Sequence, residues 1–168
     1  TLSMLGARIT LIPMPDYALA EAAGAVILHA EALEVHRDTL RERFDLYGRQ
    51  PRQSLAAGAG ITPADVARAR AAGQRIAAQI DAIVSDCDAI IAPTTLAPAP
   101  PVAAFLNDET VWTAMRTLPF NLTGHPAMSL PIGFSGNLPL GMQIIGARRA
   151  EPMICRIGAA FEAATDHS

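Results

Sequence analysis

The chain contains residue types from which a nucleophilic hydrolase could be built: Cys87, Cys155 and His125. A histidine beside a cysteine can take the thiol proton and so produce the thiolate that attacks a carbonyl. His125, however, stands between a glycine and a proline, a setting typical of a structural loop residue. The two cysteines lack the spacing of a metal site, so we expect both to be reduced and buried. We therefore assign no catalytic residue to the chain.

Glu31, Glu34 and His36 could together bind a metal ion, since they share one expected helix. Charged residues at helical spacing more commonly face solvent or form ion pairs, and we expect the same of these three. The glycines of the C-terminal third are not spaced as a phosphate-binding loop and are typical of turns and close packing. No metal and no cofactor are therefore expected.

Charge and composition exclude several classes of function. All thirteen basic residues are arginine, there is no lysine, and the net charge is −3. Without a basic patch, direct binding of nucleic acid is not expected. The uncharged run at residues 89–106 is long enough to span a bilayer, but its four prolines argue against a membrane helix. No targeting segment is visible, so we expect a cytoplasmic protein that does not bind membranes.

The spacing of apolar residues predicts helices and strands that alternate along the chain, and these elements would position the candidate residues. Helices are expected at residues 17–47, 62–83, 111–116 and 151–165, strands at 7–12, 88–93, 127–132 and 140–145, a loop at 49–60 and a turn at 135–137. Such alternation predicts an α/β structure with a partly mixed sheet. The uncharged tract at residues 117–147 contains no Asp, Glu, Lys or Arg and is typical of the interior of a large α/β enzyme.

Three motifs carry a resemblance to a known family. Residues 119–134 read PFNLTGHPAMSLPIGF, residues 137–146 read NLPLGMQIIG and residues 88–94 read DAIIAPT. Together they closely resemble the C-terminal core of the amidase signature family, which includes the A subunit of glutamyl-tRNA(Gln) amidotransferase. The resemblance implies the C-terminal half of an α/β/α sandwich whose mixed central sheet is covered by helices. We expect residues 1–168 to form one C-terminal segment of such a larger domain.

The resemblance also implies a mechanism. Members of the family cleave carboxamides with a Ser nucleophile, a second Ser on a cis peptide and a Lys base, all within a Gly/Ser-rich segment of the N-terminal half. A lysine whose pKa is lowered by burial can accept the serine proton, while backbone N–H groups hold the oxyanion. This chain has neither a lysine nor such a segment. The triad is therefore expected upstream, and the chain alone is expected to be inactive.

By position in the family motifs, eight residues would bind substrate in the acyl pocket: Thr94, Thr95, Val111, Ala114, Met115, Phe120, Asn121 and Thr123. In the amidotransferase subunits, an Asp that helps to hold the glutamine donor matches Ala114. An apolar side chain cannot pair with an α-ammonium group, which favours a different small carboxamide as substrate. A purely core role for Val111, Trp112 and Met115 stays open.

Three hypotheses follow for the parent protein. It is an amidase that converts a carboxamide to acid and ammonia, or the glutamine-hydrolysing A subunit of a tRNA-dependent amidotransferase, or a non-catalytic amidase-like interaction domain. In each case we expect apolar surface to be covered either by the missing N-terminal half or by self-association.

Overall fold

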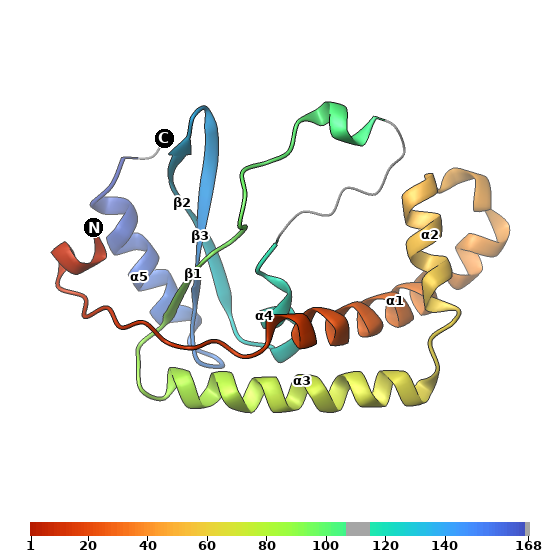
Figure 1. The fold of residues 1–168 in the computed structure, drawn as a ribbon, viewed down its shortest axis with the longest axis horizontal. Coiled ribbons are helices and arrows are strands. Elements are labelled where there is room, and N and C mark those ends of the chain that lie inside the picture. Colours follow the sequence, from red (N-terminus) through yellow and green to blue (C-terminus); the bar gives the residue numbers. More distant parts are fainter. Residues whose placement is uncertain (107–114, 167–168) are drawn as a thin grey trace.

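The computed structural model describes residues 1–106 and 115–166 (Figure 1). The helices are α1 (Tyr17–Glu42), α2 (Arg49–Gly58), α3 (Pro63–Val84), α4 (Leu118–Thr123) and α5 (Glu151–Ala163). The strands are β1 (Ile90–Pro93), β2 (Ala127–Ser135) and β3 (Leu138–Ile145), and short 3-10 helices lie at Leu2–Leu5, Phe44–Leu46 and Val102–Phe105. The expected α/β class is confirmed.

The two long helices begin where the sequence places a cap. The Asp16 carboxylate accepts hydrogen bonds from the backbone N–H groups of Ala18 at 2.9 Å and Leu19 at 3.3 Å, which starts α1. At the start of α3, Thr62 and Asp65 form a reciprocal capping box, and Pro63 between them is the first residue of the helix. Both caps satisfy backbone donors that an uncapped helix would leave without partners.

β3 is the central strand of a three-stranded sheet in the order β1-β3-β2. Ile145 of β3 pairs with Ile90 on one side and with Ala127 on the other, and both pairings are antiparallel. The expected hairpin between β2 and β3 turns at Gly136, whose φ of 62° suits a glycine. Of the mixed sheet that we expected, the described strands thus provide an antiparallel part.

Two adjacent isoleucines of β3 hold the layers together. Ile144 and Ile145 are both fully buried, and they point to opposite faces because side chains alternate along a strand. Ile145 packs with buried residues of α1, α3 and α4, whereas Ile144 packs with Ile154 and Phe161 of α5. The sheet therefore lies between α5 on one face and α1, α3 and α4 on the opposite face (Figure 1).

Two glycines let α4 approach both long helices. A Cβ added at Gly24 of α1 would lie 3.0 Å from Leu118, and one added at Gly73 of α3 would lie 2.9 Å from Leu122. The missing side chains leave room for these two leucines of α4. The short helix α4, which carries three of the expected site residues, therefore packs between α1 and α3 and against the sheet.

Four expectations about local structure need correction or comment. Residues 7–12 form no strand, and Ile9 and Leu11 are exposed, because no described strand runs beside them. The expected loop after Gly48 is largely the helix α2.

Cys87 and Cys155 are free, as expected, but exposed rather than buried. Most of the helix expected at 111–116 lies outside the described residues, and Met115 forms an isolated bridge instead.

None of the helices in the described part of the chain combines the length and the apolar character that a membrane crossing requires.

Candidate functional site

Two segments far apart in the sequence lie side by side near the end of β1, and we call them the wall segments (residues 93–95 and 115–116). Thr95 and Met115 form an antiparallel bridge, and Arg116 donates its N–H to the Thr94 carbonyl at 2.8 Å. The Thr94 N–H in turn donates to the Gly141 carbonyl of β3 at 3.0 Å. The structure thus brings together Thr94, Thr95 and Met115, three of the residues expected to line the acyl pocket.

Tyr17, in the first turn of α1, fixes the wall segments from the helical side. Its hydroxyl donates to the Met115 carbonyl, and the guanidinium of Arg116 lies 3.9 Å from the centre of its ring. A guanidinium over an aromatic face is attracted by the ring quadrupole, so the contact orients Arg116 as well as Met115. Neither Tyr17 nor Arg116 was predicted from the sequence.

The side chain of Gln143, on β3, forms hydrogen bonds to both wall segments. Its Nε2 donates to the Pro93 carbonyl at 3.1 Å and to the Arg116 carbonyl at 2.9 Å. The side chain is 1% exposed, and its Oε1 has no hydrogen-bond partner among the described residues. A buried acceptor without a partner costs about 1–3 kcal/mol. A glutamine within the apolar run Met-Gln-Ile-Ile was a signal in the sequence that could have pointed to this link and that we did not use.

Hydroxyl groups lie on the β3 side of the wall segments. Thr94 Oγ1 is 3.1 Å from Ser129 Oγ, and Thr95 Oγ1 donates to the Ala97 carbonyl at 2.8 Å. A Cβ at Gly141 would come within 2.9 Å of Thr94 Oγ1, so only glycine leaves room for this hydroxyl. Hydrogen bonds within the chain therefore hold both threonine side chains in place.

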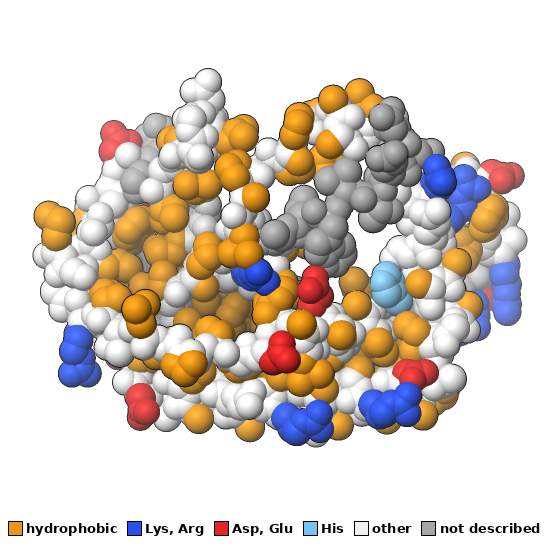
Figure 2. Space-filling view, in the orientation of Figure 1, with side chains coloured by type: hydrophobic (Ala, Val, Ile, Leu, Met, Phe, Trp, Pro, Cys, Tyr) orange, Lys and Arg blue, Asp and Glu red, His pale blue; other side chains and the backbone are white. Residues whose placement is uncertain are grey.

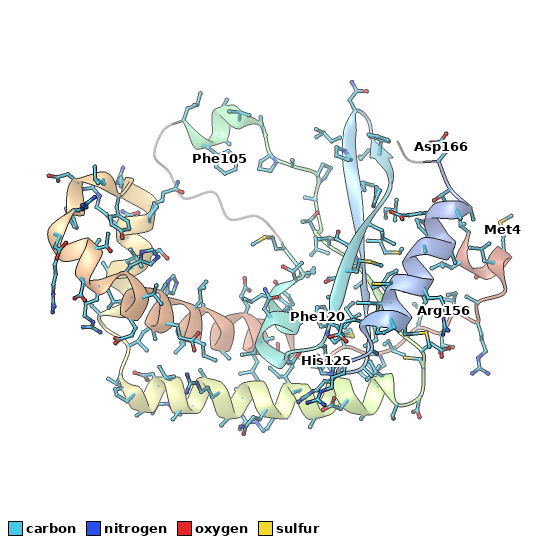
Figure 3. The ribbon with its side chains drawn as sticks, turned by 180° about the vertical axis from the view of Figure 1, so that it is seen from behind. Met4, Phe105, Phe120, His125, Arg156 and Asp166 are labelled. Atoms are coloured by element: carbon cyan, nitrogen blue, oxygen red, sulfur yellow. The ribbon has the colours of Figure 1, made fainter. Side chains whose placement is uncertain are left out.

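The site residues expected on α4 have different environments. Asn121 is exposed, whereas Phe120 and Thr123 are 4% and 6% exposed. Phe120 packs in the core with residues of α1 and α3, as Figure 3 shows at the junction of the helices with the sheet. Phe120 and Thr123 are thus almost completely covered by other parts of the chain. Val111 and Ala114 lie outside the described residues.

A series of polar contacts runs from Thr123 of α4 through the buried His125 to Asp81, an exposed residue of α3. His125 Nδ1 is 2.9 Å from Thr123 Oγ1 and its Nε2 is 3.1 Å from an Asp81 carboxylate oxygen. Because a carboxylate only accepts, Nε2 carries the proton and Nδ1 of the neutral ring accepts from Thr123. Arg148 also contacts Asp81, at 3.1 Å. The arrangement joins α3, α4 and the loop after β3, and both cysteines lie outside it, in agreement with the structural role expected for His125.

Burial lowers the pKa of His125 below its ordinary value of 6.5; Asp81 opposes this shift and Arg148 adds to it. Between the lowered pKa of the folded state and the value of 6.5 in the unfolded state, the unfolded chain binds more protons than the folded chain. The free energy of unfolding should therefore fall as the pH drops below 6.5. One group can contribute a slope of at most about 1.4 kcal/mol per pH unit. Urea denaturation at several pH values should show this slope in the wild type and in the exposed-site control His36→Gln. A slope of equal size in His125→Gln would contradict the assignment.

Of the three candidate metal residues, the two glutamates form ion pairs, as expected, and His36 Nδ1 lies 3.0 Å from the Tyr47 hydroxyl. Glu31 contacts Arg70 at 3.1 Å and Glu34 contacts Arg37 at 2.8 Å, each on exposed helix surface. Across the described ranges 1–106 and 115–166, no group of His, Cys, Asp and Glu side chains has the arrangement of a metal site.

Helices on both faces of a sheet, with an ordered wall of threonine and backbone groups beside the strand ends, define a domain of the α/β class. The family model for amidases matches residues 12–155. The chain therefore belongs to the amidase family.

Known relatives agree with this assignment. The chain is 31% identical to the A subunit of glutamyl-tRNA(Gln) amidotransferase from Thermotoga maritima, over 96% of this chain and 39% of that protein. A crystal structure of an amidase superposes with a TM-score of 0.84 at 26% identity, covering 98% of this chain and 39% of that one. The crystal structure of the Thermotoga maritima A subunit gives a TM-score of 0.65 at 28% identity, covering 98% and 36%. The chain thus spans well under half the length of these relatives.

Proposed function

We propose that this chain forms the acyl-pocket side of an amidase site that converts a carboxamide to a carboxylic acid and ammonia. The observation that carries the proposal is the ordered pair of wall segments, which lies where the family motifs place substrate-binding residues. Thr94, Thr95, Met115 and Asn121 would contact the substrate, with Val111 and Ala114 as further pocket residues. Phe120 and Thr123 would hold α4 behind them.

The chemistry itself would come from the rest of the family domain. The chain has no lysine, and the peptide bonds of its described residues are all trans. A Ser–cis-Ser–Lys triad would therefore lie in sequence upstream of these residues in the parent protein. In that arrangement the Lys would accept the nucleophile's proton while the serine oxygen attacks the amide carbon. The C–N bond would then break, ammonia would leave with that proton, and water would hydrolyse the acyl-enzyme ester to release the acid.

An apolar face of this chain supports the proposal that the remainder of the family domain packs against it. A shallow groove of about 430 Å³ is lined by the N-terminal segment, both edge strands and α5, at Thr1, Leu2, Ser3, Ile9, Ile91, Ile132 and Phe161. Figure 2 shows apolar side chains gathered over this side of the molecule. Large exposed apolar surfaces commonly mark contact sites. We propose that the remainder of the family domain covers this face, with self-association as the alternative for the isolated chain.

A second function is favoured by one observation, the match to the A subunit of a tRNA-dependent amidotransferase. In that case the parent protein would release ammonia from glutamine. Ala114 counts against this alternative, because it supplies no carboxylate for an α-ammonium group. A third reading, a non-catalytic interaction domain, rests on the absence of lysine from the chain.

The proposal predicts that purified residues 1–168 release no ammonia from any amide, because the chain lacks the nucleophile and the base. The full-length product of the gene should hydrolyse members of a panel of aliphatic and aromatic amides, measured as ammonia release. Glutamine, with and without companion subunits, belongs in the same panel.

Each outcome separates the hypotheses. If glutamine were the only amide of the panel to be hydrolysed, the result would favour the amidotransferase function. Inactivity of the full-length product toward every amide would favour the non-catalytic domain. Turnover by the isolated chain would show that the reaction needs none of the residues expected upstream.

A further inference from the structure

Gln143 is a buried amide at a position where the strand otherwise buries apolar side chains. Its neighbours Met142, Ile144 and Ile145 are all less than a tenth exposed, and Gln143 itself is 1% exposed. Sheet positions of this kind normally hold apolar residues, since a polar group without all its hydrogen bonds is unfavourable there. The amide must therefore supply something that an apolar side chain of similar size does not.

Hydrogen bonding determines the orientation of the amide. Nε2 lies within 3.1 Å of the Pro93 carbonyl and 2.9 Å of the Arg116 carbonyl, and an amide nitrogen has two protons to donate. Turning the amide over would place Oε1 against two carbonyl oxygens, which only accept. Oε1 consequently faces the side where the described residues offer no donor.

We propose that Gln143 is a positioning residue for the acyl pocket, and that its Nε2 sets the spacing of the two wall segments. The remaining links depend on that spacing: the bridge between Thr95 and Met115 and the hydrogen bond from Arg116 to Thr94 both run across the gap that Gln143 closes. This inference rests on the proposed amidase function of the wall. It adds a residue that acts on the pocket without touching the substrate.

Side-chain chemistry at this position can be varied in three ways. Gln143→Met keeps the length and removes both donors. Gln143→Glu keeps the shape and places a carboxylate against two carbonyl oxygens. Gln143→Asn keeps both donors but is one methylene shorter, so it reaches one carbonyl at best. Gln79→Met, on the exposed face of α3, is the matched control.

The first measurement is amide hydrogen exchange in residues 1–168, followed by NMR, and it does not depend on activity. In Gln143→Met the N–H of Arg116, which bridges the wall segments, should exchange at least about 10-fold faster. Amides of α5 should be unchanged, and Gln79→Met should match the wild type. Unchanged exchange at Arg116 in Gln143→Met would overturn the positioning role.

The second measurement is steady-state kinetics of the full-length gene product. A displaced wall should raise KM by about 10-fold for amides with bulky acyl groups while kcat changes less, since the triad is untouched. We expect the order Gln143→Glu, Gln143→Met, Gln143→Asn from the largest effect to the smallest. Faster exchange with unchanged KM would overturn the link to the acyl pocket. An inactive wild type would overturn the proposed function and the pocket role with it, while the exchange result would still decide whether Gln143 holds the two segments.

Discussion

Replacing Ile145 with alanine is expected to lower the free energy of unfolding of this chain by about 3–5 kcal/mol. Ile145 is fully buried and packs in the cluster that joins α1, α3, α4 and β1. Truncation removes apolar contacts and leaves a cavity that helices on one side and paired strands on two others cannot close. Urea denaturation followed by circular dichroism measures the loss.

Ile91→Ala is the matched control, because Ile91 lies on the neighbouring strand and is 39% exposed. It should cost less than about 1 kcal/mol. If Ile145→Ala leaves the chain unfolded, Ile145→Val still reports the site, with an expected loss of about 1 kcal/mol. Equal losses for Ile91→Ala and Ile145→Ala would contradict the burial of Ile145 between the layers.

Replacing Gly58 with alanine is expected to destabilise the chain by about 2–3 kcal/mol, even though alanine is the better helix former. The new Cβ would lie 2.3 Å from the His29 carbonyl oxygen and 2.8 Å from the Leu33 Cβ, both on α1. A backbone carbonyl within a helix cannot rotate away, so α2 must move as a body. Thermal unfolding followed by circular dichroism detects the change.

Gly60→Ala provides the comparison two residues further on. Its Cβ would find no atom nearer than the Ala57 carbonyl at 3.8 Å, and we expect a change within about 0.5 kcal/mol. Similar melting temperatures for Gly58→Ala and the wild type would show that α2 does not pack closely against α1.

The long elements could be predicted from the sequence because their signals are local. Apolar residues at helical spacing, with caps at Asp16 and Thr62, predict where α1 and α3 begin, although α1 ends at Glu42 and not at the expected residue 47. The hairpin was predicted from alternating runs around Gly136, and the structure extends both strands toward this turn. In each case the local preference and the tertiary packing agree.

The errors have a shared physical cause. An apolar run such as residues 7–12 becomes a strand only if another strand lies beside it, and the pattern carries no information about that partner. α2 was missed because its first turn is polar and contains Pro51, although proline is tolerated in a first turn. Contact with α1 stabilises a segment whose own helical signal is weak.

In the candidate site, too, some residues were predicted from the sequence and others were not. Resemblance to the family motifs predicted Thr94, Thr95 and Met115 as site residues, and the structure places them together. The groups that fix them, Tyr17 and Gln143, lie far away in sequence and act through hydrogen bonds to backbone carbonyls. Since every residue has a carbonyl, no residue type in the wall segments signals these links.

The uncharged tract at residues 117–147 has a consequence for unfolded copies of the chain, which lack charges there to keep them from aggregating. Prolines take the place of charged gatekeepers: Pro126, Pro131 and Pro139 interrupt the tract, and a proline cannot join a cross-β ladder. β2 accepts Pro131 because it is an edge strand with irregular pairing at that point. The proline-free run at residues 140–147 includes the buried end of β3. Folding places β3 between β1 and β2, so the longest proline-free run of this tract lies on the strand that the native sheet covers on both edges.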